Sequence, residues 1–171
     1  MVGRWLLVVG RDVMEAVNGE RPTANGQRPE LVIFVGVPGS GKSTYYFANL
    51  AATHAHVSKD LMPNARRRND RQTIAIENAL AAAQSVVVDN TNPSLAIRAP
   101  LIALGKRHDA RIIAYYFECS VRTALMRNRQ REGRGRVPDV AIFVAQKKLQ
   151  PPALDEGFDE VRVIACDASS S

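Results

Sequence analysis

Short runs of β-branched and apolar residues alternate along this chain with longer segments in which apolar positions recur at helical spacing. The short runs predict strands over residues 31–35, 56–58, 85–88, 111–117 and 160–164, and the longer segments predict helices over 43–53, 70–84, 94–108, 121–132 and 139–149. Strands that alternate with helices at this spacing form parallel sheets with right-handed crossovers. We therefore expect a three-layer α/β fold with a central parallel sheet between helices.

The beginning of the chain differs in character from the rest. Residues 1–17 predict a short strand and a helical turn, and a linker rich in Gly, Pro, Asn and Arg follows up to residue 30. We expect an N-terminal extension and linker over 1–29 and one domain over 30–171. Three interpretations of the extension stay open: a strand added to the sheet edge, a partner-binding tail, or a segment without a role.

A glycine-rich loop joins the first predicted strand of the domain to its first helix. Its sequence, GVPGSGKST over residues 36–44, contains the Gly-x-x-x-x-Gly-Lys-Ser spacing of the phosphate-binding loop (P-loop). The glycines allow successive N–H groups to point at phosphate oxygens, Lys42 brings an ammonium to the β- and γ-phosphates, and Ser43 offers a hydroxyl to Mg²⁺. We therefore expect ATP and Mg²⁺ as cofactors. The loop residues expected to bind them are Gly36, Pro38, Gly39, Ser40, Gly41, Lys42, Ser43 and Thr44.

Two aspartates come directly after predicted strands. Asp89 follows three valines, at the position where P-loop proteins place the carboxylate that orders Mg²⁺, although its sequence DNTNP is also typical of a turn. Asp60 follows the strand predicted at 56–58, where a kinase places the carboxylate that accepts the proton of an attacking hydroxyl; a helix-capping or loop aspartate is the alternative. Since ligands bind at the carboxyl ends of parallel strands, we expect both aspartates and the P-loop to share one cleft.

An arginine-rich segment follows the strand predicted at 111–117. It carries arginines at 122, 127, 129, 131, 134 and 136, with glycines at 133 and 135 where helix gives way to loop. Guanidinium groups on a lid neutralise the charge of a transferring phosphoryl group, and lid closure excludes water. We expect Arg131 and Arg127 to be catalytic, and Arg129 and Arg131 to contact the nucleotide.

Composition narrows the class of protein. A length of 171 residues with 46% apolar residues suits a single domain with a full core. The net charge of +6 and the pI near 9.7 favour a polyanionic partner such as nucleic acid.

No stretch is long enough to span a membrane, and the apolar run near the N-terminus is too short for a signal peptide, which predicts a cytoplasmic protein. Metal-ligand spacing is absent from the cysteines and histidines, which we interpret as structural residues: Cys119, Cys166, His54, His56 and His108.

Five motifs, in this order, resemble the kinase domain of the polynucleotide kinase/phosphatase family. They are GVPGSGKST, SKD, VVVDNTNP, RNRQRE before a Val-Pro dipeptide, and LDEGFDEV, and they extend over residues 31–164. The resemblance implies a P-loop NTPase kinase fold that uses ATP to phosphorylate a 5′-hydroxyl end of DNA or RNA. It makes Lys42, Ser43 and Thr44 the phosphate and Mg²⁺ groups, with Asp89 also at the metal. It makes Asp60 the general base and matches Arg131 to a lid arginine.

The same resemblance assigns the acceptor side of the site. Arg98 matches an arginine a few residues past the family's DNTN motif. Bacterial relatives carry another arginine three residues after the base, where this chain has Pro63. Either the arginines at 66–68 take its place or the acceptor differs. The residues expected to bind the acceptor are Asp60, Asp89, Asn90, Asn92, Arg98 and Arg66.

Three functional hypotheses follow. The first is a polynucleotide 5′-hydroxyl kinase. The second is a kinase of the same fold that acts on a small molecule or nucleotide sugar, because aromatic residues for base stacking are scarce in the acceptor stretch. The third is an ATP-binding regulatory protein without an external acceptor, although an intact Lys42, Asp60 and Asp89 argue against it. The sequence contains no acid phosphatase module, so we expect a separate phosphatase or ligase partner if the protein works in end repair, and the oligomeric state stays open.

Overall fold

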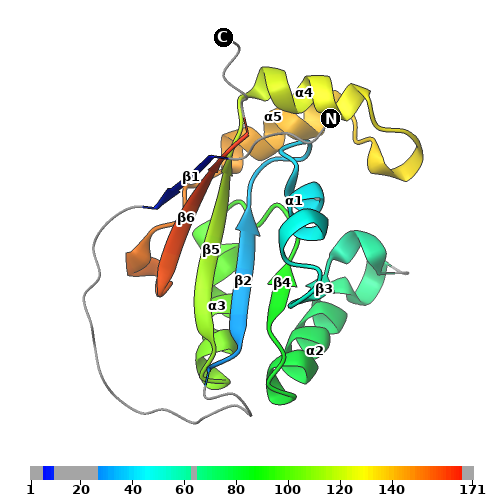
Figure 1. The fold of residues 1–171 in the computed structure, drawn as a ribbon. Coiled ribbons are helices and arrows are strands. Elements are labelled where there is room, and N and C mark those ends of the chain that lie inside the picture. The colour runs from blue at the N-terminus through cyan, green and yellow to red at the C-terminus, as the bar shows by residue number, and fades with distance from the viewer. Residues whose placement is uncertain (1–5, 10–26, 63–64, 167–171) are drawn as a thin grey trace.

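One six-stranded sheet organises the part of the chain that the structure, a computed structural model, describes: residues 6–9, 27–62 and 65–166. The strand order is β1-β6-β5-β2-β4-β3. The strands are β1 (Leu6–Val9), β2 (Glu30–Val35), β3 (Ala55–Val57), β4 (Val86–Val88), β5 (Arg111–Glu118) and β6 (Glu160–Ala165). Strands β2 to β6 run parallel, as expected, and β1 pairs antiparallel with β6 at one edge (Figure 1).

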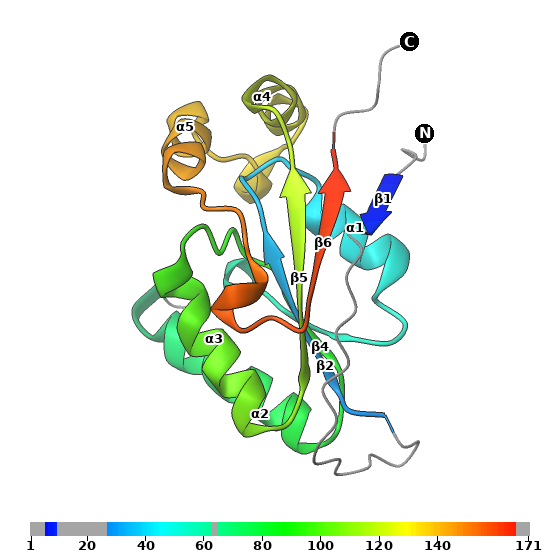
Figure 2. The ribbon, with the colours of Figure 1, turned by 90° about the vertical axis from the view of Figure 1, so that its left-hand side faces the viewer.

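Helices cover both faces of the sheet. They are α1 (Lys42–Asn49), α2 (Arg68–Ala81), α3 (Leu95–Arg107), α4 (Val121–Arg129) and α5 (Asp139–Lys148). Figure 2 shows α2 and α3 on one face and α1 on the other, with α4 and α5 beyond the carboxyl ends of the strands. The expected three-layer α/β fold is confirmed. None of the helices in the described residues has the length and apolar character that a membrane span needs.

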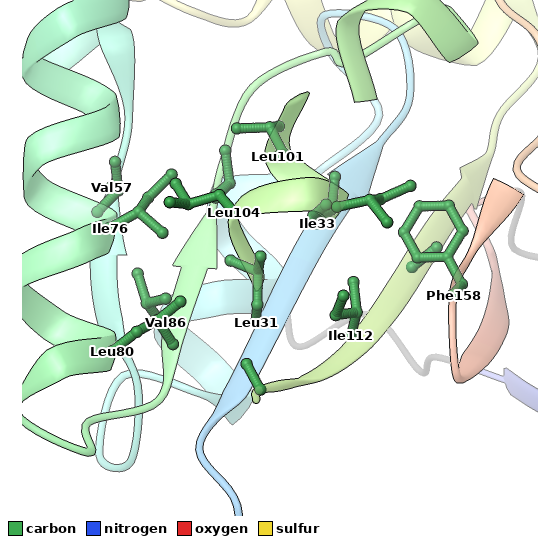
Figure 3. Close-up of a cluster of buried hydrophobic side chains, with 14 of the residues drawn as sticks. Leu31, Ile33, Val57, Ile76, Leu80, Val86, Leu101, Leu104, Ile112 and Phe158 are labelled. Carbon is green, nitrogen blue, oxygen red and sulfur yellow. The ribbon is translucent and has the colours of Figure 1, made fainter. Parts of the chain in front are cut away.

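The core lies on both sides of β2. Leu31 and Ile33 point into a cluster that α2 and α3 cover, together with Ile76 and Leu104 (Figure 3). Phe34, on the opposite side of the strand, belongs to a second cluster beneath α1. A central parallel strand is buried on both faces, which explains why β2 is a continuous apolar run and not an alternating one.

The leading segment contributes a strand to the edge of the sheet. Residues 6–9 pair with β6, with Leu6 opposite Ala165 and Val9 opposite Arg162. Of the three interpretations left open by the sequence, the sheet-edge strand therefore describes this stretch. The helical turn and most of the linker expected before residue 30 lie outside the described residues.

Three helices end at least three residues earlier than predicted. Helix α2 ends at Ala81, and Ala83 beyond it has a left-handed φ of 56°. Helix α1 ends at Asn49, because the next residues form a tight turn in which the N–H groups of Thr53 and His54 both donate to the Leu50 carbonyl. Helix α4 ends at Arg129, and its chain then turns towards Gly133, which has a left-handed φ of 59°. The arginine-rich lid segment therefore begins before residue 132, the predicted end of that helix.

A buried ion pair fixes the loop that follows β4. Arg98, in the first turn of α3, is 0% exposed and donates from Nε and Nη2 to the carboxylate of Glu156, at 2.8 and 2.6 Å. Its Nη1 donates to the carbonyls of Asn92 and Gln150, both at 3.0 Å. The arginine thereby connects the β4–α3 loop with the segment that leads into β6.

Replacing Arg98 with Met is expected to destabilise the fold by about 3–5 kcal/mol, because the buried Glu156 carboxylate loses its counter-charge. Urea denaturation of both proteins measures the change in the free energy of unfolding. Arg107→Met is the matched control: Arg107 also pairs with a glutamate, Glu77, but the two side chains are 66% and 38% exposed, so about 1 kcal/mol or less is expected. Equal losses in the two variants would contradict the assignment of Arg98 as a structural anchor.

Candidate active site

The P-loop runs from Gly36 to the start of α1 and has the expected strand-to-helix context. Gly39 and Gly41 have φ values of 84° and 90°, which lie in the left-handed region that favours glycine. A Cβ on Gly39 would lie 2.5 Å from the carbonyl oxygen of Ala124 in α4. Glycine is therefore required at 39 both for the turn and for the close approach of α4.

Lys42 is folded back onto its own loop. Its Nζ donates to the carbonyls of Gly36 and Val37 at 3.0 and 2.7 Å, and to Ser40 Oγ at 3.3 Å. Burial, with a smaller effect of the Arg131 charge, lowers the pKa of Lys42 to about 8, against the opposing effect of the Asp89 carboxylate. A phosphate entering the loop would supply the negative charge that this buried ammonium lacks.

Asp89 connects the end of β4 to the P-loop. Ser43 Oγ donates to Asp89 Oδ2 at 2.7 Å, and His56 Nε2 lies 2.9 Å from the same oxygen. The Asp89 N–H donates to the Val57 carbonyl at 2.8 Å, so the aspartate is also tied to the neighbouring strand β3. We interpreted His56 as a purely structural residue; its contact with Asp89 places it at the site.

A serine hydroxyl and a carboxylate, both hard oxygen donors, fit Mg²⁺. In the described residues no cluster of three or more His, Cys, Asp and Glu side chains is arranged to hold a metal. Mg²⁺ commonly takes few protein ligands and completes its shell with phosphate oxygens and water. Ser43 and Asp89 are the residues that would hold it.

Asp60 lies at the same edge of the sheet, in a 3₁₀ turn, η1 (Lys59–Leu61), directly after β3. Its side chain is exposed and its N–H donates to Ser58 Oγ at 3.3 Å. Asn90 holds this turn against the end of β4: its Oδ1 accepts from the Lys59 N–H at 3.0 Å and its Nδ2 donates to Gln72 Oε1 at 2.8 Å. The structure thus brings together the P-loop, Asp89 and the turn that carries Asp60.

Two residues expected at the acceptor support the site from within the fold. Asn92 is buried and donates from Nδ2 to the Phe34 carbonyl at 2.8 Å. Arg98 is buried against Glu156, and all of its described hydrogen bonds are internal. Both side chains are buried in the structure, and their hydrogen bonds brace the DNTNP loop. Arg66, in contrast, is exposed on η2 (Ala65–Arg67), next in the chain after the segment that carries Asp60.

The lid arginines have different surroundings. Arg127 donates to the Ser40 carbonyl at 3.3 Å and the Cys166 carbonyl at 2.8 Å, so it holds the P-loop backbone against the end of β6. Arg131 donates to the Gly135 carbonyl at 3.4 Å, within its own lid. Arg129 is largely exposed and pairs with Asp139 at 3.3 Å. Of the three, Arg127 donates directly to the P-loop backbone.

Asn128 closes the base of the lid and was not predicted from the sequence. It is fully buried, accepts from the Val137 N–H at 3.0 Å and donates to the Val137 carbonyl at 2.7 Å. These two hydrogen bonds hold residues 128 and 137 together, and the arginine-rich lid segment is the stretch of chain between them. One signal was available: Asn128 follows the buried Ala124 by four residues, which places a polar residue on the apolar face of α4.

Comparisons with known proteins agree with this geometry. The family described as AAA domain matches residues 31–152. The bifunctional polynucleotide phosphatase/kinase of Schizosaccharomyces pombe is 28% identical over 142 residues, which cover 81% of this chain and 34% of that protein. The chain thus spans about a third of the length of this curated relative.

Solved structures show the same fold. A chain of the Pnkp1/Rnl/Hen1 RNA repair complex is 25% identical with a TM-score of 0.62, covering 86% of this chain and 53% of that one. A gluconokinase from Sinorhizobium meliloti 1021 has a TM-score of 0.58 at 18% identity, covering 83% and 85% of the two chains, which shows the fold alone. The resemblance to the kinase domain of polynucleotide kinase/phosphatases is confirmed, and the chain belongs to the AAA domain family, with a P-loop kinase fold.

Proposed function

We propose that this protein transfers the γ-phosphoryl group of ATP to a 5′-hydroxyl end of a polynucleotide. The observation that carries the proposal is the convergence of three elements on one sheet edge. Ser43 of the P-loop bonds Asp89 at 2.7 Å, and Asn90, the next residue, holds the turn that bears Asp60. The similarity to a polynucleotide phosphatase/kinase and to a chain of an RNA repair complex supports a nucleic-acid end as the acceptor.

In the proposed reaction the 5′-hydroxyl oxygen attacks the γ-phosphorus, and the bond from that phosphorus to the β–γ bridging oxygen breaks. Asp60 accepts the hydroxyl proton, and ADP leaves. Lys42 turns from the loop carbonyls to the β- and γ-phosphates, and Arg131 neutralises charge on the transferring group. Ser43 and Asp89 would hold Mg²⁺, which would supply charge stabilisation to the phosphate oxygens.

A cluster of arginines next to Asp60 favours a polyanionic acceptor. Arg66 and Arg67 lie on η2, and Arg68 and Arg71 lie in the first turn of α2. Three of the four are exposed, Arg68 being half-buried. Such a cluster can neutralise backbone phosphates of a strand whose end reaches Asp60. The net charge of +6 also favours a polyanionic acceptor.

The decisive experiment offers γ-labelled ATP and Mg²⁺ with 5′-hydroxyl single-stranded DNA, 5′-hydroxyl RNA, and gluconate as a small polyhydroxyl acceptor. We expect label on the oligonucleotide ends and none on gluconate. Asp60→Asn is expected to lower kcat by about 10²–10⁴-fold with ATP affinity retained, because the general base is removed. Asp155→Asn, another exposed aspartate at the centre of a 3₁₀ turn, η4 (Leu154–Glu156), is the matched control and should retain full activity.

Two results would overturn the proposal. Label on gluconate alone would assign the protein to small-molecule kinases of this fold. Near-normal turnover by Asp60→Asn would remove Asp60 as the base. Salt provides an independent check, because kcat/KM for a polynucleotide with many phosphates falls steeply as ionic strength rises, whereas that for gluconate, with a single charge, changes far less.

The buried state of Lys42 predicts a pH dependence of ATP binding. In the free protein its pKa is about 8, so the ammonium is present below that pH and is lost above it, whereas bound phosphates would stabilise the charged form. ATP affinity should therefore fall as pH rises above about 8, by up to about tenfold per pH unit. Binding should also take up a proton there, which calorimetry in buffers of different ionisation enthalpy measures.

Lys42→Met should bind ATP weakly and without this pH dependence. Lys106→Met, in the last turn of α3, is the control and should keep it. An ATP affinity in the unaltered protein that stays constant from about pH 7 to about pH 9.5 would contradict the assignment of the ammonium as the phosphate-binding form.

A further inference from the structure

His56 is the one histidine in the described residues that contacts the site. It lies in the middle of β3, where it pairs in register with Val87 of β4. Its Nε2 is 2.9 Å from Asp89 Oδ2, the oxygen that also accepts from Ser43 Oγ. An ionised carboxylate only accepts hydrogen bonds, so Nε2 carries the hydrogen and donates it. Neither the family resemblance nor the proposed reaction gives this residue a role.

The imidazole ring is itself held in place. It stacks on the ring of Tyr46 in α1, with centroids 4.0 Å apart and planes 13° from parallel. The neighbouring Phe47 meets its edge at 5.5 Å. Tyr46 is anchored in turn, because its hydroxyl donates to the His54 carbonyl at 2.8 Å. Rotation of His56 would break this stack, so the direction of its N–H is fixed by α1.

We infer that His56 is a positioning residue, which holds the Asp89 carboxylate in the orientation that Mg²⁺·ATP requires. The inference rests on one part of the proposed function, which is that Asp89 helps to hold Mg²⁺. Ser43 Oγ can bind the cation through a lone pair and still donate its hydrogen to Asp89 Oδ2. His56 adds the second side-chain donor on this oxygen, and unlike Ser43 it has no part in binding the cation.

The other oxygen of the Asp89 carboxylate, Oδ1, remains available to the metal. Within the part of the chain that the structure describes, no side chain or N–H group donates to Asp89 Oδ1. With Oδ2 held by His56, Oδ1 can accept from metal-bound water or join the cation directly. Groups that orient a metal-ligating carboxylate or imidazole in this way typically contribute 10–100-fold to metal affinity.

The test measures nucleotide binding without any acceptor. A fluorescent ATP analogue is titrated at a series of Mg²⁺ concentrations, and again in the presence of a chelator. His56→Phe keeps a ring against Tyr46 and removes the donor, so we expect the Mg²⁺ midpoint to rise by about 10–100-fold with the chelator-measured affinity unchanged. His56→Gln restores a donor at a similar reach and should recover most of the loss.

His108→Gln is the matched control and should leave the midpoint unchanged, because His108 caps α3 just before β5 begins, at the edge of the sheet opposite the site. A double-mutant cycle adds a second measurement: after Asp89→Ala, the change His56→Phe should shift the midpoint no further. A normal Mg²⁺ midpoint in His56→Phe would overturn the inference. So would an equal loss of affinity with and without Mg²⁺, which would indicate general damage to the P-loop.

Failure of the proposed function gives a different result from failure of this inference. The binding assay contains no oligonucleotide, so a protein that phosphorylates some other acceptor still reports the Mg²⁺ midpoint. If His56→Phe does not fold, as thermal denaturation would show, His56→Leu removes the donor instead, and its double-mutant cycle with Asp89→Ala decides the question. In that case a cycle with fully additive effects would count against the inference.

Discussion

The hydrogen bond between Ser43 and Asp89 depends on two strands being neighbours. Strands β2 and β4 are far apart in the sequence but pair in parallel, with Ile33 opposite Val88, so the P-loop and Asp89 leave the sheet at the same edge. Strand β3 pairs with β4 on the other side and brings the Asp60 turn to that edge as well. Right-handed crossovers through α1, α2 and α3 make this order possible. The site is thus a direct consequence of the strand order.

Two buried cationic side chains, Lys42 and Arg98, have different surroundings in the structure. Lys42 is 8% exposed and Arg98 is not exposed at all, and burial of such groups is costly without partners. Arg98 has a permanent partner in Glu156, which makes it part of the scaffold. Lys42 donates to loop carbonyls and a serine hydroxyl and, in the described part of the chain, makes no ion pair, so a phosphate can improve its surroundings. The contrast separates a structural cation from one that is poised to bind an anion.

The sequence predicted the sheet, the P-loop and the strand-end position of Asp60 and Asp89, because each follows from a local pattern: an apolar run, a glycine spacing, or a polar residue that ends a strand. It did not predict the contact of His56 with Asp89 or the ion pair of Arg98 with Glu156, since these partners lie 33 and 58 residues away. A buried arginine and a substrate-binding arginine have the same sequence signature, and so have a core histidine and one that orients a carboxylate. Only the packing distinguishes them.

A crystal structure with Mg²⁺, ADP, aluminium fluoride and a 5′-hydroxyl oligonucleotide tests the central claim most directly. The 5′-oxygen should lie within about 2.6–3.2 Å of the Asp60 carboxylate and in line with the fluoride group. Lys42 should have left the carbonyls of Gly36 and Val37 for the phosphates. A 5′-hydroxyl out of reach of Asp60, or an oligonucleotide bound away from the carboxyl edge of the sheet, would contradict the assignment of this edge as a polynucleotide kinase site.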